Sequence, residues 1–254
     1  MKRMTGLLLL WSLASSAVYA GGSTPRHLID AKKILELADK ACKAVNTAKY
    51  DVAFESTGAA EPLLGSGKAS VIATGQLDRR PEKYLLELTV PRPGHGEELR
   101  LTGGSDGEVF FVIDHHHKKA YVDMDPAVIG PSARLFKAAI FGEFHDPEPF
   151  TAEINGSEDR VLKGTKRIDG EVCYEVYVVY DAGRVETTWF VSKEDSLPRA
   201  RHDKFVMLDG REASYRQTLS NLFINRKLDE GTFKFKLPEG YAKTDEVAPD
   251  FLPR

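Results

Sequence analysis

The fold is decided by the stretch Arg-Val-Glu-Thr-Thr-Trp-Phe-Val-Ser, residues 184–192, together with the sequence that follows it to Tyr241. In 184–192 apolar and polar side chains alternate, which is the period of a half-buried β-strand. Residues 193–196 favour a turn, and Pro198, which lacks a backbone donor, is expected to start the returning strand. Asp209-Gly210 then favours a tight hairpin. We therefore predict an antiparallel meander, and none of its residues suggests catalysis.

Short strands separated by turn residues are also predicted before this stretch. Tyr84, Leu86 and Leu88 alternate with polar residues and share one face of a strand. The strand 171–180 is apolar on both faces, so we expect it to be covered on both sides. About ten antiparallel strands in one sheet account for this pattern.

The stretch from 184 onward resembles a known family. Residues 189–191, Asp195, 197–199 (Leu-Pro-Arg), 219–225 and 238–241 (Pro-Glu-Gly-Tyr) are similar to the C-terminal half of the LolA-like superfamily. Its members include periplasmic carriers of outer-membrane lipoproteins and lipid-binding relatives. The order of elements agrees over roughly 28–241. The resemblance implies a mainly β fold with α, in which a curved, unclosed antiparallel sheet (a half-barrel) is covered by an N-terminal helix and a mid-chain lid helix.

Two segments have the period of a helix. Thr24-Pro25 resembles a helix start, and apolar residues at helical spacing predict an amphipathic helix over roughly 25–46. A second helix of about three turns is expected to open at Pro131-Ser132, with its apolar positions at Leu135, Phe136, Ala139, Ile140 and Phe144. It is either an ordinary core helix or a movable lid, since glycines in the flanking loops offer hinges.

The first twenty residues have the features of a signal peptide. A basic start, a short apolar run and small residues at positions 18 and 20 predict export to the periplasm and cleavage near Ala20. The alternatives are an anchor helix and a buried first helix. We predict one LolA-like domain over 21–242 and a C-terminal tail over 243–254. Loss of Lys2 and Arg3 takes the net charge from −3 to −5, which does not favour nucleic acid or an anionic membrane as the main partner.

Few residues suggest a catalytic, metal-binding or redox role. His115, His116 and His117 are expected in an exposed hairpin turn without a metal, because consecutive strand residues point to opposite faces; a weak surface metal site is the alternative. Cys42 and Cys173 are either a disulfide or two buried free thiols. Gly103-Gly104 suggests a loop. Motifs of nucleophilic or metal-dependent hydrolases do not occur, and we expect neither enzyme activity nor a cofactor.

The resulting hypothesis is non-catalytic binding of acyl chains of lipoproteins or lipids in a hydrophobic concavity, by a carrier or a sensor. The alternative is a periplasmic protein-interaction or envelope-stress-sensing module whose concavity is filled by its own helices. Expected partners are acyl chains and, in the second case, envelope proteins; nucleic acid is not expected, and membrane association is peripheral or absent. The candidate lipid-binding residues are Tyr84, Leu86, Leu88, Val185, Trp189, Val191, Leu135, Phe136, Ala139 and Ile140.

Overall fold

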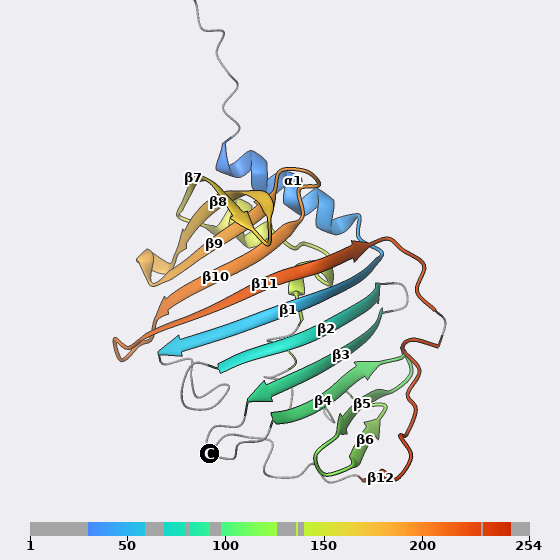
Figure 1. The fold of residues 1–254 in the computed structure, drawn as a ribbon. Helices are drawn as coiled ribbons and strands as arrows, with labels where there is room; N and C mark the ends of the chain where they lie inside the picture. The colour runs from blue at the N-terminus through green and yellow to red at the C-terminus, as the bar shows by residue number, and fades with distance from the viewer. Residues whose placement is uncertain are drawn as a thin grey trace, which may run out of the picture.

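Twelve β-strands form one sheet in the part of the chain that the structure describes. The structure, a computed structural model, describes residues 30–58, 69–79, 82–91, 98–125, 136, 140–229 and 231–244. The strand order is β12-β6-β5-β4-β3-β2-β1-β11-β10-β9-β8-β7, and within the described residues the sheet does not close into a barrel (Figure 1). The predicted fold class, an unclosed curved sheet with covering helices, is confirmed.

The elements have the following bounds. The helical elements are α1 (Ala31–Lys43), the 3₁₀ turns η3 (Gly142–Phe144) and η5 (Asp181–Gly183), and the π-helical turn η4 (Ala152–Gly156). The strands are β1 (Thr47–Gly58), β2 (Ala69–Arg79), β3 (Glu82–Pro91), β4 (Glu98–Ser105), β5 (Phe110–Asp114), β6 (Lys119–Asp123), β7 (Asp159–Ile168), β8 (Glu171–Tyr180), β9 (Val185–Ser192), β10 (Pro198–Val206), β11 (Glu212–Ile224) and β12 (Ala242–Lys243).

Two antiparallel meanders meet in the middle of this sheet. Strands β1–β6 form one and β7–β11 the other, and the long strands β1 and β11 pair antiparallel from Ala48↔Ile224 to Gly58↔Ala213. Among the described connections, the tight turn between β7 and β8 has positive φ at both Asp169 and Gly170. The last strand, β12, is the exception, because it runs parallel to β6.

Helix α1 is shorter than the sequence suggests. Asp30 is its N-cap, since the carboxylate accepts a 2.7 Å hydrogen bond from Lys33 N. The predicted start at Thr24-Pro25 lies outside the described residues. At the other end the helix stops at Lys43, and Asn225 Oδ1 accepts a 2.7 Å hydrogen bond from Asn46 N, which fixes the entry into β1.

The helix covers one face of the sheet, which we call the inner face. Ile34, Leu35 and Ala38 of α1 belong to the same buried cluster as Val52 and Trp189 of the sheet. Figure 1 shows α1 lying across the end of the sheet that contains β7 to β10. The opposite, outer face carries only small clusters, one of them formed by Cys173, Phe190 and Ala200.

The residues that carry the family resemblance have a structural role. Arg199 binds Glu171 on β8 (Nε–Oε2 2.6 Å) and Asp195 in the β9–β10 turn (Nη2–Oδ2 2.7 Å). Asp195 also accepts a hydrogen bond from Leu197 N, and Leu197 is buried. This part of the Asp-x-Leu-Pro-Arg signature therefore holds a turn in place.

The two cysteines do not form the possible disulfide. Both are free and fully buried, but Cys42 lies in the inner-face cluster and Cys173 in an outer-face cluster. On β8, Val176 and Val178 point to the inner face, where α1 packs, so strand alternation turns Cys173 away from the helix. The sheet itself separates the two thiols.

Thiol titration checks this arrangement. Denatured but unreduced protein should show two free thiols, and the folded protein should react slowly with a thiol reagent, because both side chains are 0% exposed. Burial raises the pKa of Cys173 to about 11, which further disfavours its reactive thiolate. Fewer than two thiols in the denatured sample would contradict the structure.

Candidate functional site

Most of the candidate lipid-binding residues that the structure describes gather on the inner face. Leu86, Leu88, Trp189 and Val191 are buried in the inner-face cluster, and Tyr84 packs against it half-buried. Val185 is half-buried at the start of β9 and does not join the cluster. Phe136 is buried there too, and Ile140 packs against it. Leu135 and Ala139 lie outside the described residues.

The second predicted helix ends earlier than expected. Ile140 N donates to Phe136 O at 2.9 Å, a helical hydrogen bond. At Phe141 the backbone is extended (φ −88°, ψ 96°), and its N–H donates to the Tyr50 hydroxyl of β1 at 3.3 Å. The predicted continuation to Phe144 is therefore wrong, because Phe141 leaves the helical conformation and binds the sheet instead. The chain continues as η3 and η4, and residues 140–156 are called the plug segment below.

Aromatic side chains of the plug segment fill the inner face. Phe141, Phe144 and Phe150 are all 0% exposed. Phe150 and Phe141 contact Trp189 of β9, with ring centroids 4.8 and 6.3 Å apart, and Phe144 contacts Tyr50 of β1 at 5.9 Å. Edge-to-face and tilted pairs at these distances are favourable beyond their buried area. The plug segment thus supplies the apolar layer that covers the middle of the sheet.

Phe136 occupies a space that a glycine leaves free. Gly103 lies within β4, and a Cβ atom at this position would come within 2.2 Å of Phe136 Cζ. The expectation that Gly103-Gly104 forms a loop is therefore wrong. A glycine in a strand interior often marks a close approach, and here the approaching group is the Phe136 ring.

A polar cluster is buried beneath the aromatic layer. Arg201 on β10 binds Asp203 two residues on (Nε–Oδ2 2.6 Å) and Glu143 of η3 (Nη1–Oε1 3.1 Å). Thr187 on β9 donates to the other oxygen of Asp203. Two further bonds hold the plug segment: Trp189 Nε1 donates to Glu153 Oε1 at 3.3 Å and Gln217 Nε2 to Ile140 O at 3.1 Å.

This cluster contains more carboxylates than cations. Glu143, Glu153 and Asp203 are all buried, and Arg201 is the guanidinium among them. Burial raises the pKa of Glu143 to about 7, although Arg201 opposes the shift, and burial also raises the pKa of Glu153. Burial lowers the pKa of Arg201, but Asp203 and Glu143 outweigh it and the net shift is upward. The guanidinium is therefore charged, while Glu143 can hold a proton near neutral pH.

Sequence reasoning missed the polar cluster, although a signal exists. Thr187 on β9, Arg201 and Asp203 on β10, and Gln217 on β11 occupy inner-face positions of strands whose other inner-face residues are largely apolar. Polar residues at such positions indicate a buried network, since each needs a partner. The strand sequences do not reveal Glu143 and Glu153, which complete the network from a distant part of the chain.

The histidines are only partly as predicted. Residues 115–118 form the expected hairpin turn, but only His116 is exposed, and His115 and His117 are half-buried. Buried Asp114 accepts hydrogen bonds from the backbone of His116 and His117 and pairs with His117 Nδ1 at 2.5 Å. His115 bridges Thr102 Oγ1 (2.8 Å) and the Tyr241 hydroxyl (3.0 Å). Among the described residues, no group of three or more His, Cys, Asp or Glu side chains could hold a metal ion.

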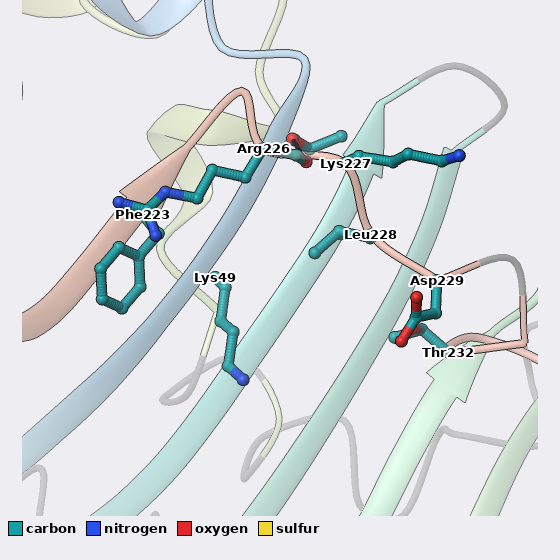
Figure 2. Close-up of a pocket in the computed structure, with 8 residues that line it drawn as sticks. Lys49, Phe223, Arg226, Lys227, Leu228, Asp229 and Thr232 are labelled. Atoms are coloured by element: carbon teal, nitrogen blue, oxygen red, sulfur yellow. Dashed lines mark hydrogen bonds between the residues drawn. The ribbon is translucent and has the colours of Figure 1, made fainter.

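Two grooves lie away from the inner-face cluster. The first, of about 320 Å³, is shown in Figure 2 and is lined by Thr47, Lys49, Phe223, Arg226, Lys227, Leu228, Asp229 and Thr232. Its cationic side chains do not converge in Figure 2, since Arg226 extends along Phe223 and Lys227 points the opposite way. The second, of about 430 Å³, lies at the other end of β1 and β11, next to the β10–β11 hairpin. Neither groove is lined by a predicted lipid-binding residue.

None of the described helices has the length and apolar character needed to cross a membrane.

Substitution of Gly103 tests the packing of the Phe136 ring against β4. Gly103→Ala should lower the free energy of unfolding by roughly 1–3 kcal/mol, because the new methyl group overlaps the ring and forces it to move. Gly142→Ala is the matched control, since a Cβ there would meet nothing within 4 Å. Urea unfolding of both variants gives the comparison. Equal stability of the two variants would contradict the packing described.

The Glu143 carboxyl should make stability depend on pH. Its pKa is about 7 in the folded protein and 4.5 as the reference value, so folding takes up a proton between these values. The unfolding free energy should then fall as pH rises from about 4.5 to 7, by up to about 3 kcal/mol at about 1.4 kcal/mol per pKa unit. Other groups titrate in the same window, so the quantity to measure is the difference between the native protein and Glu143→Gln. A difference that is flat with pH would contradict a protonated, buried Glu143.

Comparison with known proteins identifies similar folds only. No protein-family model matches the chain, and no curated protein matches it. The crystal structure of the Mycobacterium tuberculosis lipoprotein LppX is 12% identical, with 78% of this chain and 96% of that chain covered and a TM-score of 0.46. A DUF1329 family protein from Desulfovibrio piger is 12% identical (80% and 97% covered, TM-score 0.36). A LolA superfamily protein from Nitrosomonas europaea is 13% identical (82% and 98% covered, TM-score 0.30). All three TM-scores are below 0.5, so the description of the fold rests on the strand order given above.

Proposed function

We propose that the protein is a non-catalytic periplasmic binding protein that holds an acyl chain of a lipid or lipoprotein between the inner face of the sheet and the plug segment. The observation that carries the proposal is the way the inner face is covered. Its middle is filled by three phenylalanines of a segment that belongs to no strand and contains only short helical turns.

The plug segment can leave without breaking the sheet. Among the described residues, the backbone-to-backbone hydrogen bonds of 140–156 stay local, as in Phe144 N to Phe141 O and Ile154 N to Phe150 O. Its bonds to strands use side chains, such as those of Tyr50, Trp189 and Gln217. Segments with few backbone bonds to the rest of a protein open at low free-energy cost, and binding sites are often built from them.

The free energy lost when the three phenylalanines leave the inner face is comparable with the free energy gained when an acyl chain replaces them. Exposure of Phe141, Phe144 and Phe150 would cost roughly 1.5–3 kcal/mol each. An acyl chain of about 14 carbons recovers about 0.8 kcal/mol per methylene, or about 11 kcal/mol when fully buried. The longer chain therefore gains more than the roughly 4.5–9 kcal/mol that exposure of the three rings costs, whereas a chain of about six carbons gains about 5 kcal/mol and so has little or no net advantage.

A second function remains supported by one observation. The chain itself fills the inner face, since the side chains of Phe141, Phe144, Phe150 and Trp189 are fully buried by other residues. This supports a protein-interaction or envelope-stress-sensing module whose core is complete. The two functions differ in whether the plug segment is displaced.

Binding of a fluorescent acyl probe separates the two functions. The native protein should bind the probe, and Leu88→Gln should weaken binding at least tenfold, because Leu88 is buried on the inner face and a buried amide would lack a partner. Thr89→Gln is the matched control on the outer face of the same strand. Circular dichroism checks that both variants fold.

Absence of probe binding by the native protein, together with absence of lipid in mass spectra of the purified protein, would favour the interaction module. Equal weakening by both variants would show that the inner face is not the binding site.

A further inference from the structure

The polar cluster loses one carboxyl group, that of Glu143, if the plug segment moves away from the inner face. Asp203 is two residues from Arg201 on β10, so this ion pair stays with the sheet. Glu143 belongs to the plug segment and would leave with it. The guanidinium Nη1 would then lose its carboxylate partner in a site where its side chain is 28% exposed. A hydrogen bond between a guanidinium and a carboxylate is stronger than one between neutral groups, so a ligand carboxyl group placed there would restore the bond that Glu143 gives up.

We propose that the position of the Glu143 carboxyl group is a headgroup subsite, and that the ligand is an acyl chain ending in a free carboxyl group. Glu143 occupies the subsite in the empty protein. The inference rests on the proposed function, and it adds the chemical class of the ligand.

The geometry joins the subsite to the apolar layer. Trp189 contacts Phe150 and Phe141 on one side, and the Arg201 guanidinium lies 5.0 Å from the centroid of the same ring. The guanidinium also lies 5.9 Å from the Tyr215 ring. An acyl chain that replaces Phe141 and Phe150 along Trp189 therefore ends next to Arg201. A carboxyl oxygen is the group that already binds there.

The charges of the cluster select the kind of headgroup. Arg201 is already paired with Asp203, and Glu153 adds a second carboxylate that stays near the cluster only while the plug segment is in place. A phosphate dianion would bring two negative charges to one guanidinium that is already neutralised. A carboxyl group can instead keep a proton, as Glu143 does with its pKa near 7 in this environment. An ester can accept a hydrogen bond from Arg201, but it can neither donate one nor carry the charge that strengthens a bond to a guanidinium.

The proton held by Glu143 makes ligand binding depend on pH. When Glu143 moves into water its pKa returns towards 4.5, and near pH 6 it releases a proton. A fatty acid takes up a proton as it enters the subsite, so the two changes cancel. A methyl ester takes up none. Between pH 5 and pH 7, ester binding should therefore strengthen as pH rises, while fatty-acid binding should change little.

The experiment compares three competitors against the fluorescent acyl probe on the native protein. These are tetradecanoic acid, its methyl ester and tetradecyl phosphate, each measured at pH 5, 6 and 7. At pH 6 the acid should compete at least tenfold better than the ester and the phosphate. In Glu143→Gln the ester should lose its pH dependence, while Glu148→Gln, at an exposed position of the same segment, should retain it. In Arg201→Lys, which keeps the charge and loses the planar fork, the preference for the acid should shrink.

The outcomes separate the inference from the proposed function. Equal competition by acid and ester overturns the carboxyl subsite and leaves acyl binding intact. Better competition by the phosphate also overturns it. If none of the three compounds competes and the probe itself does not bind, the proposed function fails as well.

Discussion

The structure depends on the pairing of β1 with β11. These two strands come from opposite ends of the described chain, and Thr57 Oγ1 and Ser214 Oγ lie 2.7 Å apart near one end of the ladder while Asn225 binds Asn46 near the other. Without this ladder the two meanders would be separate half-sheets. Because the contact closes most of the chain into one loop, its entropy cost is large and must be met by the inner-face cluster. Such non-local pairing is typical of slowly folding β proteins.

Once the two meanders are joined, the inner face has to be covered. Helix α1 packs on β7, β8, η3 and η4, which leaves the middle of the sheet to the plug segment. The plug segment brings apolar rings to that surface and also two carboxyl groups. The rings gain from burial, whereas the carboxyl groups oppose it unless they are protonated or paired. The covering of the sheet is thus a balance between these two kinds of side chain, and Arg201 lies where they meet.

Alternation along single strands was sufficient to predict much of the fold. It placed Leu86 with Leu88, and Trp189 with Val191, on a common face of each strand, and Pro198 gave the start of a strand. It could not place segments relative to one another. Cys42 and Cys173 are on different faces of the sheet, which depends on where α1 packs, and a glycine is needed at position 103 because a ring from another segment rests on β4 there. For the same reason, Glu143 could not be identified as a partner of Arg201 from the sequence of β10.

The parallel pairing of β12 with β6 has a consequence for association between copies of the chain. An open sheet ends in two strands with unpaired backbone groups, and such edges promote pairing with other chains. One edge is β7, where a bulge near Gly164 interrupts the ladder, and Lys163 and Lys166 lie over the Tyr177 and Phe190 rings. Near the other edge, the Tyr241 hydroxyl contacts His115, and Ala242 and Thr244 donate backbone hydrogen bonds to Lys118 and Ala120. The C-terminal segment therefore covers the backbone groups of β6, and the edge strand that results, β12, has only two residues, which disfavours pairing with a second chain.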